Sequence, residues 1–334
     1  MMKKRVLVVG ILTVSLMSLM LVGCNNEETP VSEVSEMNIG VLQGPTAMGM
    51  VGLMDEADNG NIEDVTYQFT LYGSPDEVVP ALIQGHLDIA ALPSNLASIL
   101  YNNTDGDIQV IAINTLGILH IVEAGQSITT VEDLRGMTIY ASGHSSAPEF
   151  ILNYILEGNG LDPQHDVNIE WLSEHTEVTT RLAMSENGIA MLPQPFVTVA
   201  QNQNEALRLA LDLTEEWDNI QANTDTSSAL IMGVLVARRA FIEQNPVAVS
   251  SFLDHFESSV NFVNGNTNEA AQLIEYYDIF PAQVATRALP HSNITFIAGS
   301  EMKELFSGYL QVLFEQQPES IGGEMPSDNF YYIR

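Results

Sequence analysis

The chain has 334 residues, of which 46% are hydrophobic and 16% are charged. This composition is typical of a globular protein and excludes a collagen-like or disordered chain, and the length predicts two domains. The 43 Asp and Glu residues outnumber the 11 Lys and Arg residues and give a net charge of −32. Such an acidic excess argues against nucleic-acid binding, which needs clustered basic residues, and we interpret it as an adaptation to a salty or alkaline exterior.

The N-terminus has the layout of a secretory signal. Three basic residues precede an apolar run over 6–22, and Gly23 and Cys24 follow. A charged segment, an apolar segment and a small residue before the cut define such a signal, and the four residues ending at Cys24 resemble the lipobox of bacterial lipoproteins. We predict a signal peptide over 1–23, lipidation of Cys24, and a flexible, polar tether over 24–36. An ordinary signal followed by a chance cysteine is the less favoured alternative. The folded part is then expected on the outer face of the cytoplasmic membrane, held by its lipid anchor on the extracellular or periplasmic side.

Short apolar runs alternate with amphipathic stretches along the rest of the chain. A Ser with a Glu three residues later marks the start of a helix, as at Ser74 and Ser146. The expected strands, in chain order, are 37–42, 65–72, 87–92, 108–122, 137–141, 167–172, 189–192 and 229–237. The expected helices are 75–85, 94–101, 130–134, 146–157, 174–184, 247–263, 268–277 and 302–314.

Strands separated by helices of about 10–15 residues predict an α/β fold with parallel sheets and right-handed crossovers. Two long apolar runs are expected to be strands that cross between two α/β units, with hinge candidates at 121–124 and 230–233. We therefore predict two α/β lobes joined by a two-strand hinge, with a helical C-terminal part. Lobe 1 is expected to be discontinuous over 37–122 and 234–334, and lobe 2 is expected to cover 123–233.

Loops that follow the predicted strands are rich in hydroxyl and small side chains. In open parallel sheets, ligands bind beyond the carboxyl ends of the strands, where helix N-termini offer free N–H groups. Each Ser or Asn there is also an ordinary helix cap, but five such loops facing one cleft favour a binding site. The candidate ligand contacts are Thr46, Ser74, Ser94, Asn95, Ser142, His144, Ser145, Ser146 and Gln194.

The charge of these loops narrows the ligand. None of the eight Lys and Arg residues beyond the signal peptide lies in them, although tight binding of a free anion usually recruits Arg. We therefore expect a neutral, zwitterionic or cationic organic ligand. Arg181 could swing in from its helix, so sulfonates stay open. Flat faces for a ring or a cation are offered by Tyr72, Tyr140, Tyr154, Trp171 and Phe196.

Four segments carry a family resemblance: Gly44–Gly49, Gly85–Pro93, Val131–Gly136, and Asn245-Pro246 with the helix after it. In this order they resemble the solute-binding lipoproteins of ABC importers, in particular the nitrate, sulfonate, taurine and thiamine-precursor (NMT1/SsuA-like) group. The resemblance covers 38–332 and implies a type II periplasmic-binding-protein fold that closes on a small molecule. It also implies a membrane permease and an ATPase subunit as partners. We expect a monomer without a cofactor.

Two enzymatic alternatives remain open. The same fold serves as an enzyme in chorismate-dehydratase-like proteins, although these work inside the cell. Gly143 to Ala147 imitates the nucleophile elbow of serine hydrolases, with Ser145 as nucleophile and His255 or His291 downstream. No Gly-rich oxyanion segment precedes it, and the seven histidines show no compact metal-ligand spacing. We therefore predict a binding protein, not an enzyme, and no metal site.

Overall fold

The computed structural model describes residues 35–224 and 227–334, and the chain from Val34 to Arg334 packs as one compact unit. The predicted signal peptide, the lipidation site Cys24 and nearly all of the tether lie outside the described residues. Within the described part, no helix combines the length and the apolar character needed to cross a membrane.

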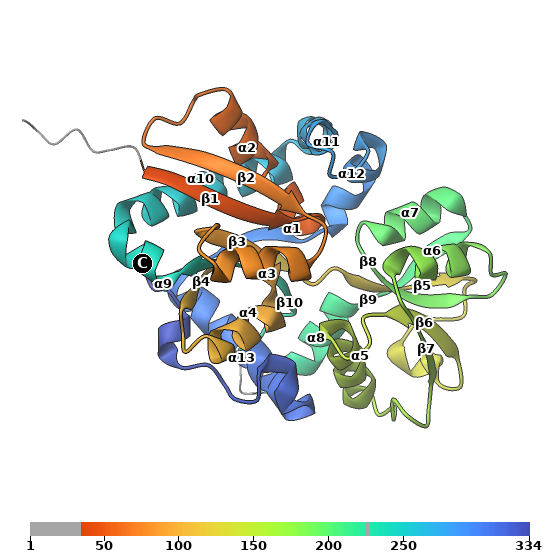
Figure 1. Cartoon of the computed structure of the whole chain (residues 1–334). Coiled ribbons are helices and arrows are strands. Elements are labelled where there is room, and N and C mark those ends of the chain that lie inside the picture. Colours follow the sequence, from red (N-terminus) through yellow and green to blue (C-terminus); the bar gives the residue numbers. More distant parts are fainter. Residues whose placement is uncertain (1–34, 225–226) are drawn as a thin grey trace, which may run out of the picture. The chain divides into compact units, whose positions relative to one another are not determined.

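A six-stranded mixed sheet, sheet A, forms the centre of lobe 1 (Figure 1). β1 pairs in parallel with β2 and β3, whereas β10 runs antiparallel between β3 and β4. The strands, in their order across the sheet, are β11 (Ile294–Ile297), β4 (Ile108–Leu116), β10 (Ile231–Arg238), β3 (Ile89–Pro93), β1 (Ser35–Leu42) and β2 (Val65–Tyr72).

A second, five-stranded sheet, sheet B, forms the centre of lobe 2. β6 pairs in parallel with β7 and β8, and β5 runs antiparallel between β8 and β9. The strands, in their order across the sheet, are β7 (Asn168–Leu172), β6 (Thr138–Ser142), β8 (Ile189–Pro193), β5 (Leu119–Ala124) and β9 (Leu207–Asp212).

The chain passes between the sheets twice. β4 ends in sheet A at Leu116 and β5 begins in sheet B at Leu119, so only Gly117 and Ile118 lie between them. The boundary predicted after 122, and the hinge candidate at 121–124, therefore fall inside β5. The apolar run over 108–122 is two strands in different sheets, and Gly117 is the break that separates them.

The return crossing follows α8 (Leu213–Gln221) and ends where β10 begins at Ile231. The boundary predicted between 233 and 234 thus falls inside a strand of sheet A. We use "the crossings" below for residues 114–120 and for residues 212–224 and 227–233, which include the residues that flank each passage.

Helices cover both faces of sheet A. On one face, α2 and α10 enclose an apolar core with the side chains of Met37, Ile39 and Val41 from β1. The helices around this core are α1 (Pro45–Met48), α2 (Val51–Asp58), α9 (Arg239–Gln244), α10 (Pro246–Gly265), α11 (Thr267–Tyr276) and α12 (Ala282–Ala288), followed by the short 3-10 helix η2 (Leu289–His291). The sequence did not predict α9, α12 or the four-residue strand β11.

On the other face, α3 (Pro75–Ile83), α4 (Ser94–Asn103) and α13 (Gly299–Gln316) pack on a core that continues into lobe 2. Tyr309 of α13 meets Trp217 of α8 with ring centroids 5.6 Å apart. Two 3-10 helices end the chain, η3 (Pro318–Ile321) and η4 (Asp328–Phe330). The long C-terminal helix therefore joins the two lobes through apolar contacts.

Lobe 2 places its helices around sheet B. They are the 3-10 helix η1 (Val131–Leu134) and the helices α5 (Ala147–Gly158), α6 (His175–Ala183), α7 (Phe196–Gln203) and α8. The sequence did not predict any helix or strand between 196 and 228, where the structure has α7, β9 and α8. Asp212 caps α8 by accepting a hydrogen bond from the Thr214 N–H at 2.9 Å, a start signal that was available in the sequence.

Candidate ligand-binding site

The strand directions bring the predicted loops to one edge of each sheet. The carboxyl ends of β1, β2, β3 and β4 share an edge of sheet A with the start of β10, because Leu116 pairs with Ile231 and Pro93 with Gly233. The carboxyl ends of β6, β8 and β9 share an edge of sheet B with the start of β5. The crossings connect these two edges, as expected for a fold that binds ligands beyond its strand ends.

The four predicted contacts of lobe 1 differ in what their side chains do. Thr46 is partly buried and its hydroxyl donates to the Leu42 carbonyl at 2.8 Å, and Ser74 precedes α3 without a side-chain cap bond. Ser94 is 1% exposed and donates to the Ile231 carbonyl at 2.6 Å. Asn95 donates to the Ser320 carbonyl at 3.1 Å. Ser94 and Asn95 therefore secure β10 and η3, and Ser94 is the first helical residue and not the predicted cap.

In lobe 2, the loop after β6 is held by its own side chains. The Ser146 hydroxyl donates to the Gly143 carbonyl at 2.6 Å and makes no cap bond to the N–H groups of α5. Glu149 instead accepts from the Ser145 N–H at 2.5 Å and lies 2.8 Å from Nδ1 of His144. The predicted capping box is therefore wrong in its hydrogen bonds, although α5 begins where expected.

The remaining predicted contacts of lobe 2 are paired with neighbours. Ser142 is buried, with its hydroxyl 2.6 Å from Nδ1 of His175, and burial lowers the pKa of that histidine. Gln194 is 2% exposed and its Oε1 accepts from the Thr198 hydroxyl at 3.0 Å. His144 is exposed and stacks on Trp171 with ring centroids 5.4 Å apart.

The crossings contain polar side chains that sequence analysis missed. Within the described residues, the buried side-chain atoms without a hydrogen-bond partner belong mostly to the crossings. They are both amide atoms of Asn114, the hydroxyls of Thr115, Thr214 and Ser228, both ring nitrogens of His120, and Nε1 of Trp217; Tyr331 lies elsewhere. A buried polar group left unpaired costs about 1–3 kcal/mol of stability. A group of such atoms in one place therefore needs an explanation, and binding of a ligand is one.

Two glycines allow the side chains of the crossings to lie close to the neighbouring backbone. A Cβ at Gly233 would lie 2.5 Å from Asn114 Oδ1 and 3.0 Å from Thr46 Cγ2, and a Cβ at Gly117 would clash with the Thr214 hydroxyl. Gly233 thus brings the predicted contact Thr46 next to Asn114, and Gly117 brings α8 against the first crossing.

The ionisable groups at the crossings are acidic or neutral. His120 is 1% exposed, its Nδ1 lies 3.8 Å from Asp212 Oδ1, and the backbone of His291 lies against it. Burial lowers the pKa of His120 although Asp212 opposes this effect, so the ring is neutral at pH 7. No Lys or Arg of the described residues approaches this cluster in any ion pair or hydrogen bond.

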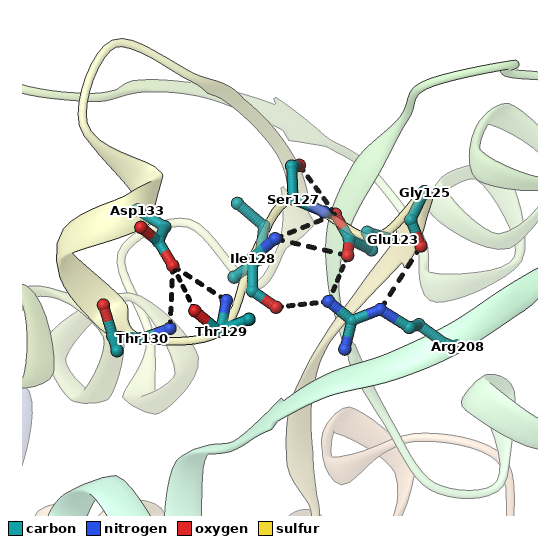
Figure 2. Close-up of polar contacts among 8 residues, drawn as sticks. All are labelled: Glu123, Gly125, Ser127, Ile128, Thr129, Thr130, Asp133 and Arg208. Atoms are coloured by element: carbon teal, nitrogen blue, oxygen red, sulfur yellow. Dashed lines mark hydrogen bonds and ion pairs between the residues drawn. The ribbon is translucent and has the colours of Figure 1, made fainter.

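Arg208, the basic residue of β9, is committed to the opposite end of β5. It pairs with the buried carboxylate of Glu123, and its guanidinium also donates to the carbonyls of Gly125 and Ile128 (Figure 2). Ser127 and Ile128 donate to the same carboxylate. Burial raises the pKa of Glu123, but these hydrogen bonds outweigh it and lower the pKa overall. The pair stabilises sheet B and leaves no charge for a ligand.

A hollow of about 950 Å³ lies away from the crossings, between α5, β7 and the end of α13. Its lining includes Glu149, Trp171 and Gln316, and none of the buried unpaired atoms of the described residues belongs to it. We therefore place the candidate site at the crossings, because unpaired buried donors and acceptors point to a ligand more directly than an open volume.

One protein family and several solved structures match this chain. The family model of the periplasmic substrate-binding protein of phosphonate ABC transporters matches residues 59–253. The chain belongs to this family. The protein is therefore the substrate-binding component of an ABC import system. Because the family is periplasmic, the expected localisation outside the cytoplasm is confirmed.

Solved structures share the fold of this binding protein. An ABC transporter protein from Parabacteroides distasonis is 23% identical, with a TM-score of 0.74 over 89% of this chain and 99% of that one. The aliphatic sulphonate binding protein SsuA of Escherichia coli is 17% identical, with a TM-score of 0.69 over 87% and 96%. The nitrate-binding protein NrtA of Synechocystis PCC 6803 is 13% identical, with a TM-score of 0.61 over 89% and 84%. These similarities confirm the two-lobed type II fold predicted from the sequence. No curated protein matches this sequence.

One signal in the sequence pointed to the missed residues of the binding protein. Asn114, Thr115 and His120 interrupt an otherwise apolar run that was predicted to be buried. Polar residues in a buried strand need partners, and their position next to Gly117 indicated the end of a strand. The contribution of α8 carried no such signal, because Thr214 reaches the site only through the packing of α8 on the first crossing.

Proposed function

We propose that this protein captures a small organic ligand between its two lobes at the crossings and delivers it to a membrane permease, with an ATPase subunit driving import. The observation that carries the proposal is the cluster of buried, unpaired polar side chains on both crossings. Closure of lobes about two connecting segments is a standard hinge motion. The crossings are then both the hinge and the floor of the site, so closure and ligand contact involve the same residues.

The ligand we propose is neutral, zwitterionic or cationic. The family model is named for phosphonates, and two structural neighbours are named for a sulphonate and for nitrate. Binding proteins for free anions benefit from Arg, which forms bidentate contacts. In this chain the described basic side chains are engaged elsewhere, for example Arg238 with Asp88 and Arg181 with Glu170 and the Tyr140 ring. The carboxylate of Asp212 at the second crossing favours a ligand that carries a hydrogen-bond donor.

The proposal is tested by finding a ligand and then placing a bulky side chain at the proposed site. The mature protein is screened by thermal shift against a metabolite library, because a ligand that binds the folded state raises its apparent stability. Thr46→Trp places a bulky ring at a position close to Gly233 and Asn114, and Val247→Trp serves as a control because Val247 is 78% exposed on α10. Any ligand found should lose at least about tenfold in affinity, which is about 1.4 kcal/mol, with Thr46→Trp and keep it with Val247→Trp. Equal affinity in all three proteins by calorimetry would move the site away from the crossings.

We also propose that the protein releases its ligand unchanged. The hydrolase alternative needs a histidine beside Ser145. His255 is instead engaged on lobe 1, where its Nδ1 is hydrogen-bonded to the Tyr67 hydroxyl at 2.8 Å. Nothing in the family or the neighbours supports a chorismate-dehydratase-like activity. The ligand identified by the screen, incubated for hours with the protein and then extracted, should be recovered intact by mass spectrometry, whereas accumulation of a product would establish an enzyme.

The finer points of location complete the proposal. A lipid at Cys24 would hold the protein on the outer face of the cytoplasmic membrane, close to the permease, and a tether over 24–36 would give the folded part freedom to dock. The two lobes within one chain complete the site, which is consistent with a monomer.

A further inference from the structure

We propose that Asn114 determines ligand specificity by binding an uncharged edge that carries a hydrogen-bond donor and acceptor side by side, as in a carboxamide, a lactam or a nucleobase. This inference rests on the proposed function, because it concerns the same site at the crossings.

Asn114 is a buried side chain whose two polar atoms are both unpaired. It is 1% exposed on β4, and neither Oδ1 nor Nδ2 has a hydrogen-bond partner among the described residues. Because both atoms are unpaired, the conclusion is the same whichever way the amide is turned. The Thr115 hydroxyl, next along the strand, is also buried and unpaired.

The surroundings of Asn114 preserve this unpaired amide. Gly233 on the paired strand has no side chain, and a Cβ there would lie 2.5 Å from Asn114 Oδ1. Thr46 lies on the other side of the same space, with its hydroxyl already donating to Leu42. Thr46 therefore presents its methyl group and leaves the amide of Asn114 as the polar group of this corner.

The chemistry of the amide selects among ligands. An asparagine side chain offers one acceptor and two donors in a plane. Sulfonate and nitrate oxygens, and those of a fully ionised phosphonate, only accept, so they would leave Oδ1 unpaired, and an ammonium group only donates, so it would leave Nδ2 unpaired. A carboxamide, a lactam or a base edge satisfies both atoms at once, as asparagine does with adenine in DNA recognition.

Access to Asn114 depends on the hinge. Asn114 is 1% exposed, so under this proposal a ligand reaches it when the crossings open, and closure then shields the new hydrogen bonds from water. Such desolvated hydrogen bonds are the ones that discriminate most strongly, since a mismatched ligand leaves a buried group unpaired.

The first test separates a ligand contact from a structural role. Leucine matches the shape of asparagine without its polar atoms, and removing an unpaired buried polar group is neutral or stabilising. Asn114→Leu should therefore keep or raise the melting temperature of the ligand-free protein. Ser94→Ala is the control, because Ser94 is equally buried but donates to Ile231, and it should lower the melting temperature. A drop in Asn114→Leu as large as that in Ser94→Ala would show that the amide is paired structurally, for example by water, and would overturn the proposal.

The second test uses chosen probes on the wild type, Asn114→Leu and Thr46→Trp. Nicotinamide, uracil and cytosine carry donor–acceptor edges, and the sulfonic acids methanesulfonate and ethanesulfonate carry acceptors only. At least one edge-bearing probe should stabilise the wild type, with affinity lowered at least about tenfold in Asn114→Leu. Failure of all three edge-bearing probes, or stabilisation by the two acids alone, would overturn the inference.

The variants also distinguish this inference from the proposed function. A probe that binds the wild type and Asn114→Leu equally, but fails to bind Thr46→Trp, overturns the role of Asn114 and leaves the site at the crossings. A probe that binds all three proteins equally overturns both.

Discussion

Glu123 is the most strongly held carboxylate of sheet B. It is 1% exposed and accepts hydrogen bonds from Ser127, Ile128 and Arg208 (Figure 2). Hydrogen bonds to a charged group contribute about 1.5–3 kcal/mol each when they are buried, whereas an exposed ion pair contributes less than about 1 kcal/mol. Arg208 is 34% exposed, so most of the stabilisation belongs to the carboxylate and its N–H donors.

Glu123→Gln should therefore lower the free energy of unfolding at pH 7 by about 2 kcal/mol. The pKa of Glu123 is lowered in the folded state from its ordinary value of 4.5. The stabilisation is thus fully present above that value and is lost as the pH falls through the lower folded pKa. Urea denaturation should show the difference between the two proteins shrinking in acid. The exposed Glu205→Gln is the control, and a pH-independent difference would refute the charged role.

His120 gives the opposite kind of pH dependence. Its burial lowers its pKa below the ordinary 6.5; the charge of Asp212 and a hydrogen bond with the His291 backbone oppose this shift, and the charge of His291 adds to it. The unfolded chain therefore takes up a proton that the folded protein resists.

His120→Phe should remove part of the loss of stability that the wild type shows as the pH falls from 6.5 toward the folded pKa, while the two proteins differ by a constant amount above pH 7. The buried His175 is present in both proteins, so its contribution cancels in the comparison. Midpoints of urea unfolding between about pH 7 and 5 measure this effect. A His120→Phe profile parallel to that of the wild type would show that His120 does not titrate with unfolding.

At the scale of elements, α13 shows a glycine whose role is set by packing. Alanine in a helix is favoured over glycine by about 1 kcal/mol, so the sequence alone suggests that Gly308→Ala stabilises the protein. In the structure, a Cβ at Gly308 would clash with the backbone carbonyl of Ser227. A backbone atom cannot move aside as a flexible side chain can.

Gly308→Ala should therefore destabilise the protein by about 1–3 kcal/mol, because overpacking outweighs helix propensity. Gly265, at the end of α10, is the matched control, since a Cβ there meets nothing within 4 Å. Gly265→Ala should change the free energy of unfolding by less than about 0.5 kcal/mol. Thermal denaturation of both variants measures the contrast, and a stabilised Gly308→Ala would mean that the chain near Ser227 yields to α13.

At the scale of the whole molecule, we expect attachment to the membrane to depend on one residue. Cys24 is the single cysteine of the chain, and a lipoprotein anchor with two or more acyl chains binds membranes firmly where one chain binds weakly. Cys24→Ala should move the protein from the membrane fraction into the medium or periplasm, as measured by fractionation with a carbonate wash. Retention of the variant in the washed membranes would contradict lipidation at this position.

The sequence by itself determined the fold class and pointed to the edge of the sheets where we propose the site. Alternating apolar runs and helix start signals are local, so they identified β1, β2, β3, β6 and β8 within a few residues. The loops after these strands were recognised because Ser, Gly and Pro mark strand ends through backbone preferences that need no tertiary partner.

Only the tertiary structure decided which polar groups of those loops are free. Of the loop residues, Ser94, Asn95 and Gln194 hydrogen-bond to other residues. By contrast, the amide of Asn114 on β4 and the hydroxyl of Thr214 on α8 are buried without a hydrogen-bond partner among the described residues. A hydrogen bond between residues far apart in sequence leaves no local pattern, and neither does its absence. The break at Gly117 was hidden for the same reason, since an apolar strand is continuous in sequence whether it pairs in one sheet or passes from one sheet to the other. The types and order of the residues determined the helices and strands. Contacts between residues far apart in sequence determined which polar groups stay unpaired at the proposed site.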